Sequence, residues 1–289
     1  MKVHSDCVPC LMKRVLFQAR LLDNGTEFDA VTVALKTYAK NISRGQNSAR
    51  LATAVHRSAY DAMGVIDPYF ELKVRADEVA ERYIGRLEEF VNKSDDRFAA
   101  AVRVSIIGNI MDFGSGIAID DPDDFENHFE ELLLQGIGFD ETEKVKKIVE
   151  DAGTVIYMFD NCGESQFDKI LIRELKRMGK RIVGVVRGQA ILNDVTLKDA
   201  LRIGLDKEVD LLLTSNSFSI GVDMKKIGDD LKYEISQASI ILAKGMANYE
   251  SLSDEKLSIP IAYLLRSKCI PVSRCLGVKI GTNVVKLQE

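Results

Sequence analysis

Polar residues that could bind a metal ion follow two short apolar runs in the second half of the sequence. Asp160 and Asn161 come directly after the run Val-Ile-Tyr-Met-Phe at 155–159, and Asp194 comes a few residues after a second run at 182–186. Carboxylate and amide oxygens are ligands that hard cations such as Mg²⁺ or Mn²⁺ prefer. Asp160, Asn161 and Asp194 are therefore predicted to bind a divalent metal ion.

Groups that could bind a phosphate follow other runs of the same kind. Lys244 supplies a positive charge after one run, and Ser215 and Asn216 supply hydroxyl and amide donors after another. Phosphate oxygens accept hydrogen bonds from such donors. A metal ion, a lysine and amide donors together indicate a site that handles phosphoryl groups. Lys244, Ser215 and Asn216 are predicted to bind the substrate. Asp160 and Asp194 are, together with Lys244, the predicted catalytic residues.

Each of these polar groups also has a purely structural explanation. Asp194 could cap a helix that begins near Val195, because aspartate is a preferred N-cap residue. Residues 215–217 could form a turn held by their own side chains, and residues 160–163 could be a simple turn after a strand. Taken singly, the structural and functional interpretations have equal support. The recurrence of polar groups after successive runs favours a functional site.

The apolar segment 98–113 also ends in polar residues, among them Asn109 and Asp112. Its composition is compatible with a strand, but three successive alanines and the spacing of the apolar residues favour a helix. Asn109 and Asp112 could belong to an ordinary helix C-terminus. Alternatively they face a ligand, and Asn109 is then a further substrate-binding residue.

The elements that would position these residues alternate regularly after residue 150. Strands are predicted at 154–159, 182–186, 210–214, 238–242 and 260–265, helices at 166–178, 195–203 and 224–236, and a possible edge strand at 281–287. This alternation is typical of a doubly wound parallel sheet. In such sheets ligands bind beyond the carboxyl ends of the strands, which is where the polar groups lie.

The first hundred residues contain helical patterns and no β-rich stretch. Thr26 with Asp29, and Asp140 with Glu143, resemble capping boxes. The sequence Asp-Pro at 67–68 predicts the start of a long charged helix that continues to about residue 92. We expect a helical N-terminal or cap domain at 1–97, followed by an α/β metal-binding catalytic domain at 98–289.

The composition limits the classes of function. The chain has 289 residues, of which 46% are hydrophobic and 29% charged, and a net charge of −5. The charge argues against nucleic-acid binding, which needs a basic surface. There is no apolar run of eighteen residues and no apolar leader segment, so we expect no membrane partner and a cytoplasmic location. The expected partner is a small phosphorylated metabolite; the oligomeric state is left open.

Two other classes of function remain as alternatives. Of the five cysteines, Cys7 and Cys10 form a Cys-x-x-Cys pair, and Cys269 and Cys275 lie near the other end. They could form a non-catalytic metal-binding or redox module, although a packing role is the simpler explanation for the pair. The second alternative is a Rossmann-like transferase that uses a nucleotide or S-adenosylmethionine. The sequence lacks the glycine-rich loop that such a transferase would have after the first predicted strand. It also has no P-loop, which argues against a P-loop nucleotide hydrolase, and no Gly-x-Ser-x-Gly elbow, which argues against a serine hydrolase.

Four ordered motifs resemble the damage-control phosphatase family, first catalogued as domain of unknown function 89. They are Gly-Asn-Ile-Met-Asp-Phe-Gly at 108–114, Asp-Asn-Cys-Gly-Glu at 160–164, Arg-Gly at 187–188 with Leu-Asn-Asp-Val-Thr at 192–196, and Lys-Gly-Met-Ala-Asn-Tyr-Glu at 244–250. The N-terminal Cys-x-x-Cys is similar to the archaeal and bacterial branch. One departure is Ala247, where many members have a second glycine.

The resemblance implies a helical N-terminal domain on a Rossmann-like α/β domain. It also implies hydrolysis of small phosphate monoesters, such as damaged or surplus phosphometabolites, with a divalent ion (Mg, Mn, Co or Ni). Asp160, Asn161 and Asp194 would be the metal ligands by this resemblance. Lys244 would bind phosphate, with Asn109 and Ser215 or Asn216 near it. The nucleophile would be either a water or an aspartate.

Overall fold

The computed structural model describes residues 1–112 and 121–289. Two residues of the predicted motifs, Phe113 and Gly114, lie outside the described residues. Within the described part of the chain, no helix is both long and apolar enough to span a bilayer.

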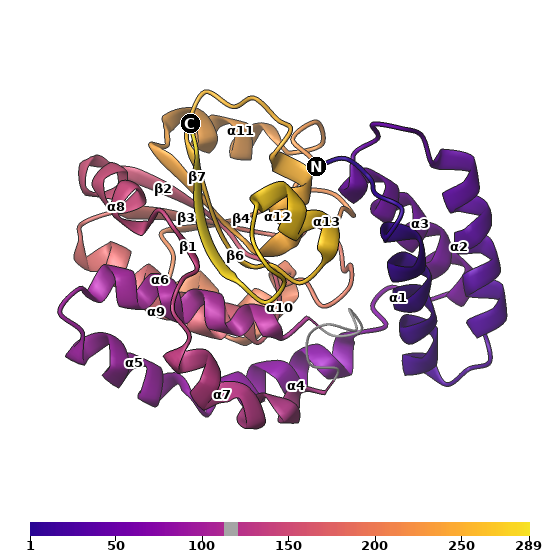
Figure 1. Ribbon diagram of the computed structural model, residues 1–289, viewed down its shortest axis with the longest axis horizontal. Helices are drawn as coiled ribbons and strands as arrows, with labels where there is room; N and C mark the ends of the chain where they lie inside the picture. The colour runs from indigo at the N-terminus through magenta and orange to yellow at the C-terminus, as the bar shows by residue number, and fades with distance from the viewer. Residues whose placement is uncertain (113–120) are drawn as a thin grey trace.

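A seven-stranded sheet forms the centre of the fold (Figure 1), with the strand order β1-β7-β6-β5-β2-β3-β4. Every neighbouring pair is parallel except β6 and β7. The strands are β1 (Phe139–Asp140), β2 (Thr154–Met158), β3 (Arg181–Val186), β4 (Leu211–Thr214), β5 (Ile240–Lys244), β6 (Ile261–Arg266) and β7 (Asn283–Gln288). The predicted α/β class, with a parallel sheet after a helical N-terminal region, is confirmed.

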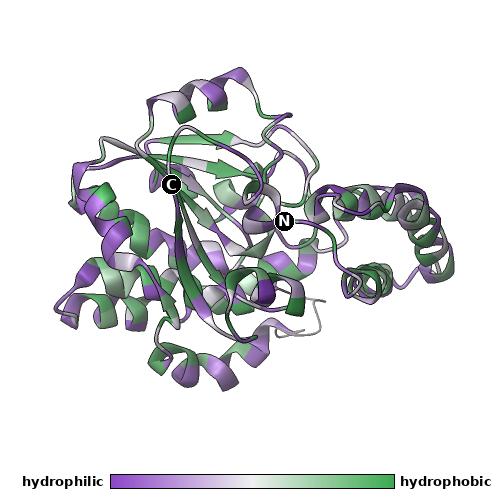
Figure 2. Ribbon diagram, turned by 45° about the horizontal axis from the view of Figure 1, so that its top comes forward, coloured by the Kyte–Doolittle hydropathy of each residue, from purple (hydrophilic) through white to green (hydrophobic). Residues whose placement is uncertain are grey.

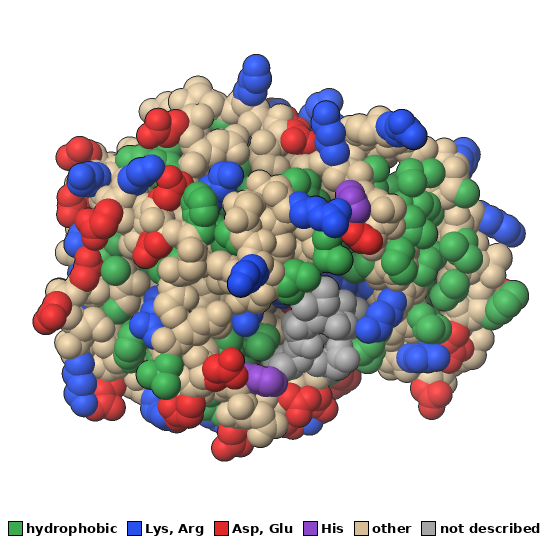
Figure 3. All heavy atoms as spheres, in the orientation of Figure 1, with side chains coloured by type: hydrophobic (Ala, Val, Ile, Leu, Met, Phe, Trp, Pro, Cys, Tyr) green, Lys and Arg blue, Asp and Glu red, His purple; other side chains and the backbone are tan. Residues whose placement is uncertain are grey.

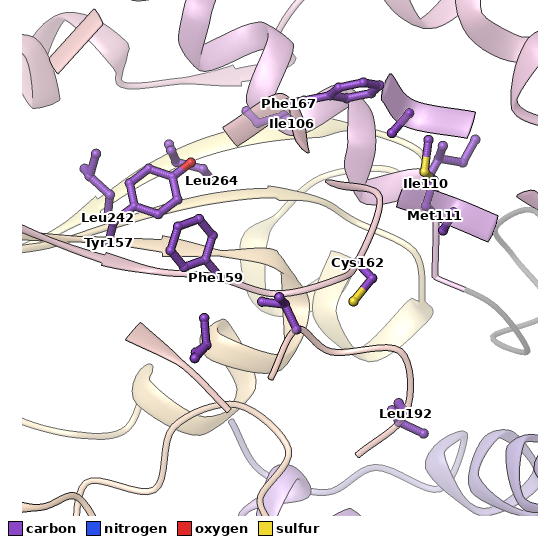
Figure 4. Close-up of a cluster of buried hydrophobic side chains, with 14 of the residues drawn as sticks. Ile106, Ile110, Met111, Tyr157, Phe159, Cys162, Phe167, Leu192, Leu242 and Leu264 are labelled. Carbon is purple, nitrogen blue, oxygen red and sulfur yellow. The ribbon is translucent and has the colours of Figure 1, made fainter. Parts of the chain in front are cut away.

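The strands are apolar on both faces because both faces are covered by helices. Alternate residues of β2 belong to different hydrophobic clusters: Val155 and Tyr157 to one, Ile156 and Met158 to the other. Tyr157 and Phe159 lie in contact on the first face, with ring centroids 4.9 Å apart (Figure 4). Figure 2 shows the same pattern for the whole sheet, with hydrophobic strands inside and hydrophilic helix surfaces outside.

Helices α6 (Arg97–Ile107) and α9 (Glu164–Arg177) pack together over one face of the sheet. On their outer side lie α4 (Phe70–Glu81), α5 (Ile84–Lys93) and α7 (Phe125–Leu134), and α8 (Thr142–Asp151) packs beside β7 (Figure 1). The remaining helices of this unit are α10 (Leu197–Arg202), α11 (Asp229–Gln237), α12 (Gly245–Leu252) and α13 (Ile270–Leu276). Residues of α11, α12 and α13 join the hydrophobic cluster on the opposite face.

The first three helices stand to one side of the sheet (Figure 1). They are α1 (Cys7–Leu22), α2 (Glu27–Asn41) and α3 (Ser48–Met63). Helix α3 packs against α12, so these helices face the edge of the sheet at which β5 ends. In contrast α4 and α5 contact α9. The predicted domain boundary after residue 97 stays a prediction.

Three local predictions were wrong. The long helix expected from residue 67 to about 92 is divided into α4 and α5, because the chain turns at Arg82 and Tyr83. The Tyr83 ring packs 4.4 Å from Phe129, which anchors the turn. Thr26 makes no side-chain capping bond to α2. Asp140 lies in β1, and its carboxylate accepts from the Thr142 amide.

Segment 98–113 is helical as far as Ile110, as the favoured interpretation predicts. Helix α6 continues to Ile107 and is followed by a 3₁₀ turn, Gly108–Ile110, that ends beside the strand ends. The helix predicted at 224–236 begins only at Asp229. The other helices and strands predicted after residue 150 agree with the structure to within two residues at each end, which is the normal uncertainty of such boundaries.

Candidate functional site

A cavity of about 320 Å³ lies at the carboxyl edge of the sheet, and Asp160, Asn161 and Asp194 all line it. Asp160 and Asn161 follow β2, which lies between β5 and β3 in the sheet. The order of the strands reverses here, because the chain continues from β2 to β3 on one side and returns to β5 on the other. Ligands of doubly wound sheets bind at such a reversal. The other wall of the cavity comes from α1 and α3.

Backbone hydrogen bonds hold Asp194 beside Asn161. The Val195 amide donates to the Asp160 carbonyl at 2.8 Å, and the Cys162 amide donates to the Asn193 carbonyl at 2.9 Å. These bonds pair the loop after β3 with the end of β2. Helix α10 is capped by a capping box of Thr196 and Asp199, as the structure shows. Asp194 is therefore not a helix cap, and the structural explanation weighed for it is wrong.

Arg187 joins the two carboxylates. Its Nε donates to Asp194 Oδ2 at 2.5 Å, its Nη2 to Asp160 Oδ1 at 3.1 Å, and its Nη1 to Asn248 Oδ1 at 3.2 Å. Only 1% of Arg187 is exposed. The guanidinium thus fixes the separation and orientation of Asp160 and Asp194 while using one oxygen of each.

The amide of Asn161 has a defined orientation. Its Nδ2 donates to Asp160 Oδ2 and to Glu164 Oε2, each at 3.0 Å. Carboxylate oxygens accept hydrogen bonds, so the amide nitrogen must face them and Oδ1 must point the other way. Among the described residues, no hydrogen bond reaches Asn161 Oδ1 or Asp194 Oδ1. These two oxygens are therefore available to a ligand.

The donor set fits a hard divalent cation. Two carboxylates and one amide oxygen are a common protein contribution for an ion that keeps several of its waters. The described residues contain no group of three or more His, Cys, Asp or Glu side chains placed to bind a metal. Asp160, Asn161 and Asp194 do not form such a group, because only two of them are carboxylates and the third ligand would be the amide oxygen of Asn161. Burial raises the pKa of both Asp160 and Asp194. The negative charges of Asp194 and Glu164 raise the pKa of Asp160 further. A nearby cation would oppose these shifts.

The structure places Lys244 away from the cavity. The side chain is fully buried, and its ammonium pairs with Glu164 and Asp168 and donates to the Ser105 carbonyl. Burial alone would lower the pKa of Lys244, but the charges of Asp168 and Glu164 raise it. Lys244 therefore supports the residues behind the site in this structure.

Asn109 lies directly behind the predicted metal ligands and is also fully buried. Its Nδ2 donates to Glu164 Oε2 at 2.8 Å and to Asp160 Oδ2 at 3.4 Å. Its Oδ1 accepts from the Arg266 amide at 3.1 Å. With both ends of the amide in use, Asn109 orients Asp160 rather than facing the cavity.

Ser215 and Asn216 lie outside this cavity. The Ser215 hydroxyl accepts from the Gly188 amide at 3.1 Å, and Asn216 Oδ1 accepts from the Thr214 hydroxyl at 2.8 Å. Asn216 lines a separate surface pocket with Arg57. The structure therefore does not bring these two residues together with Asp160, and it shows the local turn bonds that the structural explanation predicts.

Sequence reasoning missed two charged residues of the cavity, Arg14 and Lys268, and it raised a third, Asp112, only as an alternative. Arg14 Nη2 donates to Asp112 Oδ1, and Lys268 Nζ pairs with Asp112 Oδ2, both at 2.7 Å. Burial alone would raise the pKa of Asp112, but Arg14 and Lys268 hold it at about 2. Lys268 comes two residues after β6, whereas Lys244 is the last residue of β5. In the sequence both follow an apolar run, and that was the available signal. Arg14, on α1, had none.

Three thiols line the same cavity: Cys7, Cys10 and Cys269. All are reduced. Burial raises the pKa of Cys7 to about 11 and that of Cys269 to about 12. Thiols of this kind are protonated near neutral pH, whereas the thiolate is the form that binds metals and attacks disulfides. Although the three thiols share a cavity, the described residues contain no group of three or more His, Cys, Asp or Glu side chains placed to hold a metal, so the structure does not support the cysteine-based alternative.

Comparisons with known proteins cover the whole chain. Residues 3–284 match the family described as Damage-control phosphatase ARMT1-like domain. A protein of Archaeoglobus fulgidus named damage-control phosphatase is 40% identical over 292 residues, with 100% of both sequences covered. A damage-control phosphatase of Pyrococcus horikoshii is 29% identical over 287 residues, which cover 98% of this chain and 97% of the relative. The crystal structure of a DUF89 family protein from Pyrococcus horikoshii aligns with a TM-score of 0.88 at 27% identity, over 100% of both chains. The chain therefore belongs to the ARMT1-like damage-control phosphatase family.

Proposed function

We propose that the protein is a metal-dependent phosphatase that hydrolyses small phosphate monoesters, with a role in the control of damaged metabolites. The names of two relatives support the phosphatase activity and the role in damage control. The observation that carries the proposal for this chain is the convergence of Asp160, Asn161 and Asp194 on one cavity that also contains Arg14 and Lys268. The cavity volume, about 320 Å³, lies at the small end of ligand sites, which suits a small metabolite.

The charges around the cavity support a metal ion and a phosphate bound together. The carboxylates of Asp160, Asp194 and Asp112 face the cations Arg187, Arg14 and Lys268. These six groups sum to zero charge when all are ionised, whereas Asp6 and Glu250 line other parts of the cavity. A divalent cation with a phosphate dianion adds no net charge, whereas either ion alone would leave an uncompensated charge in a buried site.

Each group then has a defined task. Asp160, Asn161 and Asp194 would hold the divalent ion, which when bound polarises a phosphoryl oxygen and lowers the pKa of a bound water. Lys268 and Arg14 would bind the remaining phosphoryl oxygens, where negative charge increases during the reaction. Asp194 Oδ1, which Arg187 leaves unused, is placed to orient an attacking water or accept its proton. Asp160 has both oxygens in hydrogen bonds and is the less suitable nucleophile.

The proposal is tested by phosphate release from p-nitrophenyl phosphate and ethyl phosphate with Mg²⁺, Mn²⁺, Co²⁺ or Ni²⁺. The purified protein should be inactive after chelation and active again when one of these ions is added. Asp160→Asn should lose at least a hundredfold in kcat/KM and bind the metal more weakly by calorimetry. The matched control is Asp206→Asn, a change in a short turn far from the cavity.

The outcomes are clear. Undiminished turnover by Asp160→Asn, or equal activity with and without the ion, would reject the assigned site. Absence of hydrolysis with every ion and ester would reject the phosphatase activity.

A further inference from the structure

The walls of the cavity differ from its base. Its base carries the carboxylates, Arg14 and Lys268, whereas most of the walls are aliphatic. The apolar wall, as we call it, consists of Leu11, Leu192, Ile220, Met246, Ile270 and Ile280. These residues come from five separate parts of the chain, so the apolar character is a property of the assembled cavity. Figure 3 shows hydrophobic side chains at the junction between the N-terminal helices and the α/β unit.

Two of these residues are unusually exposed for their type. Ile270 is 42% exposed and Ile280 is 48% exposed, and both line the cavity. Exposed single apolar residues are common, but two that line one ligand site add apolar surface that a ligand could cover. Pro271, which is buried, also lines the cavity at the start of α13.

Leu192 faces the cavity in a conformation that is unfavourable for a leucine. Its φ of 49° lies in the left-handed region, where glycine or asparagine is the usual residue. Its amide donates to the Tyr60 hydroxyl at 3.0 Å, which helps to hold the loop in place. Figure 4 shows Leu192 on a loop that lies apart from Cys162. A leucine at a position that suits glycine places a large apolar side chain in the wall.

Most polar residues of the walls are already hydrogen-bonded to other groups of the protein. The Ser48 hydroxyl donates to the Met1 carbonyl at 3.2 Å and lies 3.4 Å from a Glu250 oxygen. His56 Nδ1 bonds to Gln18 at 3.1 Å, and burial together with Arg14 lowers the His56 pKa to about 3, so the ring is neutral. The protonated thiol of Cys7 adds weakly polar surface. Asp6 and Glu250 also line the cavity; Asp6 pairs with His4, and Glu250 accepts from the Ser48 hydroxyl. Within the described residues, the aliphatic part of the walls therefore offers few partners for ligand hydroxyls.

We propose that the substrate is a phosphate monoester whose organic part is an aliphatic chain, bound along the apolar wall, rather than a polyhydroxylated sugar. This inference rests on the proposed phosphatase function and specifies its substrate class. A sugar phosphate would bury hydroxyl groups without partners, which costs free energy for each one. An aliphatic chain instead gains free energy for each methylene that leaves water.

The test compares ethyl, butyl and hexyl phosphate with glucose 6-phosphate, which has the same number of carbons as hexyl phosphate. We expect kcat/KM to increase about twofold to fourfold for each added methylene. Hexyl phosphate should exceed glucose 6-phosphate at least tenfold. A flat dependence on chain length, or equal turnover of the sugar phosphate, would overturn the inference.

Variants of the apolar wall test where the alkyl chain of the substrate binds. Ile270→Asn and Ile280→Asn should each reduce the ratio of kcat/KM for hexyl over ethyl phosphate at least threefold. Both residues are exposed enough to tolerate the change. Ile66→Asn is the matched control, because Ile66 is 85% exposed and does not line the cavity. An unchanged ratio in both wall variants would also overturn the inference.

Binding separates this inference from the phosphatase activity. Ethylphosphonate and hexylphosphonate carry the same alkyl chains but cannot be hydrolysed as esters. Calorimetry with them measures how the alkyl chain contributes to binding without turnover. At least tenfold tighter binding of hexylphosphonate supports the apolar site even if no ester is hydrolysed, and only the proposed activity then fails. Equal affinities would reject the apolar site.

Discussion

Gly245 and Asp160 are in such close contact that no other residue fits at position 245. A β-carbon on Gly245 would lie 1.7 Å from Asp160 Oδ2. Its φ of 71° is also in the left-handed region. The first residue of α12 therefore determines where the carboxylate of Asp160 can lie. The group that Gly245 accommodates in the structure is a predicted metal ligand.

Gly245→Ala should displace Asp160 and abolish activity. We expect the strained backbone to cost about 1–2 kcal/mol, and the contact with Asp160 to add about 1–3 kcal/mol. Gly179→Ala is the matched control, since Gly179 has a φ of 77° and no atom within 4 Å of the added carbon. Denaturant unfolding should show the cost of the strained backbone in both variants. The value of kcat/KM should fall in Gly245→Ala alone. Equal activities would contradict the proposed role of the contact.

Lys244→Met should destabilise the protein. It would leave Glu164 and Asp168 as two buried carboxylates without a cation, at a cost of about 3–5 kcal/mol. The free energy of unfolding, measured with urea, reports this loss. If Lys244 instead binds substrate, as the sequence predicts, the variant would keep its stability and show a raised KM. Adding Asp168→Asn to Lys244→Met should recover part of the stability, because it removes one of the unpaired charges.

The stability of the metal-free protein should decrease as pH rises because of Asp168. Burial raises the pKa of this carboxyl from 3.8 to about 7, although Lys244 opposes the shift. The folded state therefore binds a proton that the unfolded state releases. The contribution of Asp168 is complete below pH 3.8 and is lost as the pH approaches about 7. Urea midpoints of the wild type and Asp168→Asn should diverge over this range.

Parallel pH curves for the two proteins would contradict the assignment to Asp168. Asp112 and Asp199 do not interfere, because their pKa values are lowered to about 2. The stability that they contribute is present above 3.8 and is lost as the pH falls toward 2. Their effect therefore lies below the range in which Asp168 titrates.

Lys268→Met should lower kcat/KM about tenfold to a hundredfold, because hydrogen bonds to a charged group contribute about 1.5–3 kcal/mol. The fold should remain, since Arg14 still pairs with Asp112. Lys225→Met, a change at an exposed lysine, is the control. Steady-state kinetics and thermal unfolding distinguish the two effects. A variant with normal kcat/KM would show that Lys268 does not bind the phosphoryl group.

The sequence predicts the central strands well because a strand covered on both faces is a continuous apolar run. It also predicts Asp160, Asn161 and Asp194 as neighbours, since parallel strands end at one edge of the sheet. It could not predict that Asp168, four residues after Glu164 on a charged helix, faces inward to Lys244. That contact depends on which side of α9 packs on the sheet.

Arg14 is the clearest residue that the sequence could not assign. It belongs to a helix whose charges look like a solvated surface, and its contact with Asp112 crosses 98 positions of the chain. Lys268 was within reach, because it follows a predicted strand as the other polar groups do. Only the packing of the N-terminal helices against the sheet edge shows that both cations line one cavity.

The cavity brings together residues from the first helix and from the segment after the sixth strand. Arg14 is synthesised long before Lys268. A nascent chain therefore lacks part of the base and the mouth of the site until the segment after β6 has been added. Chains that terminate before this segment should be unable to bind or consume metabolites.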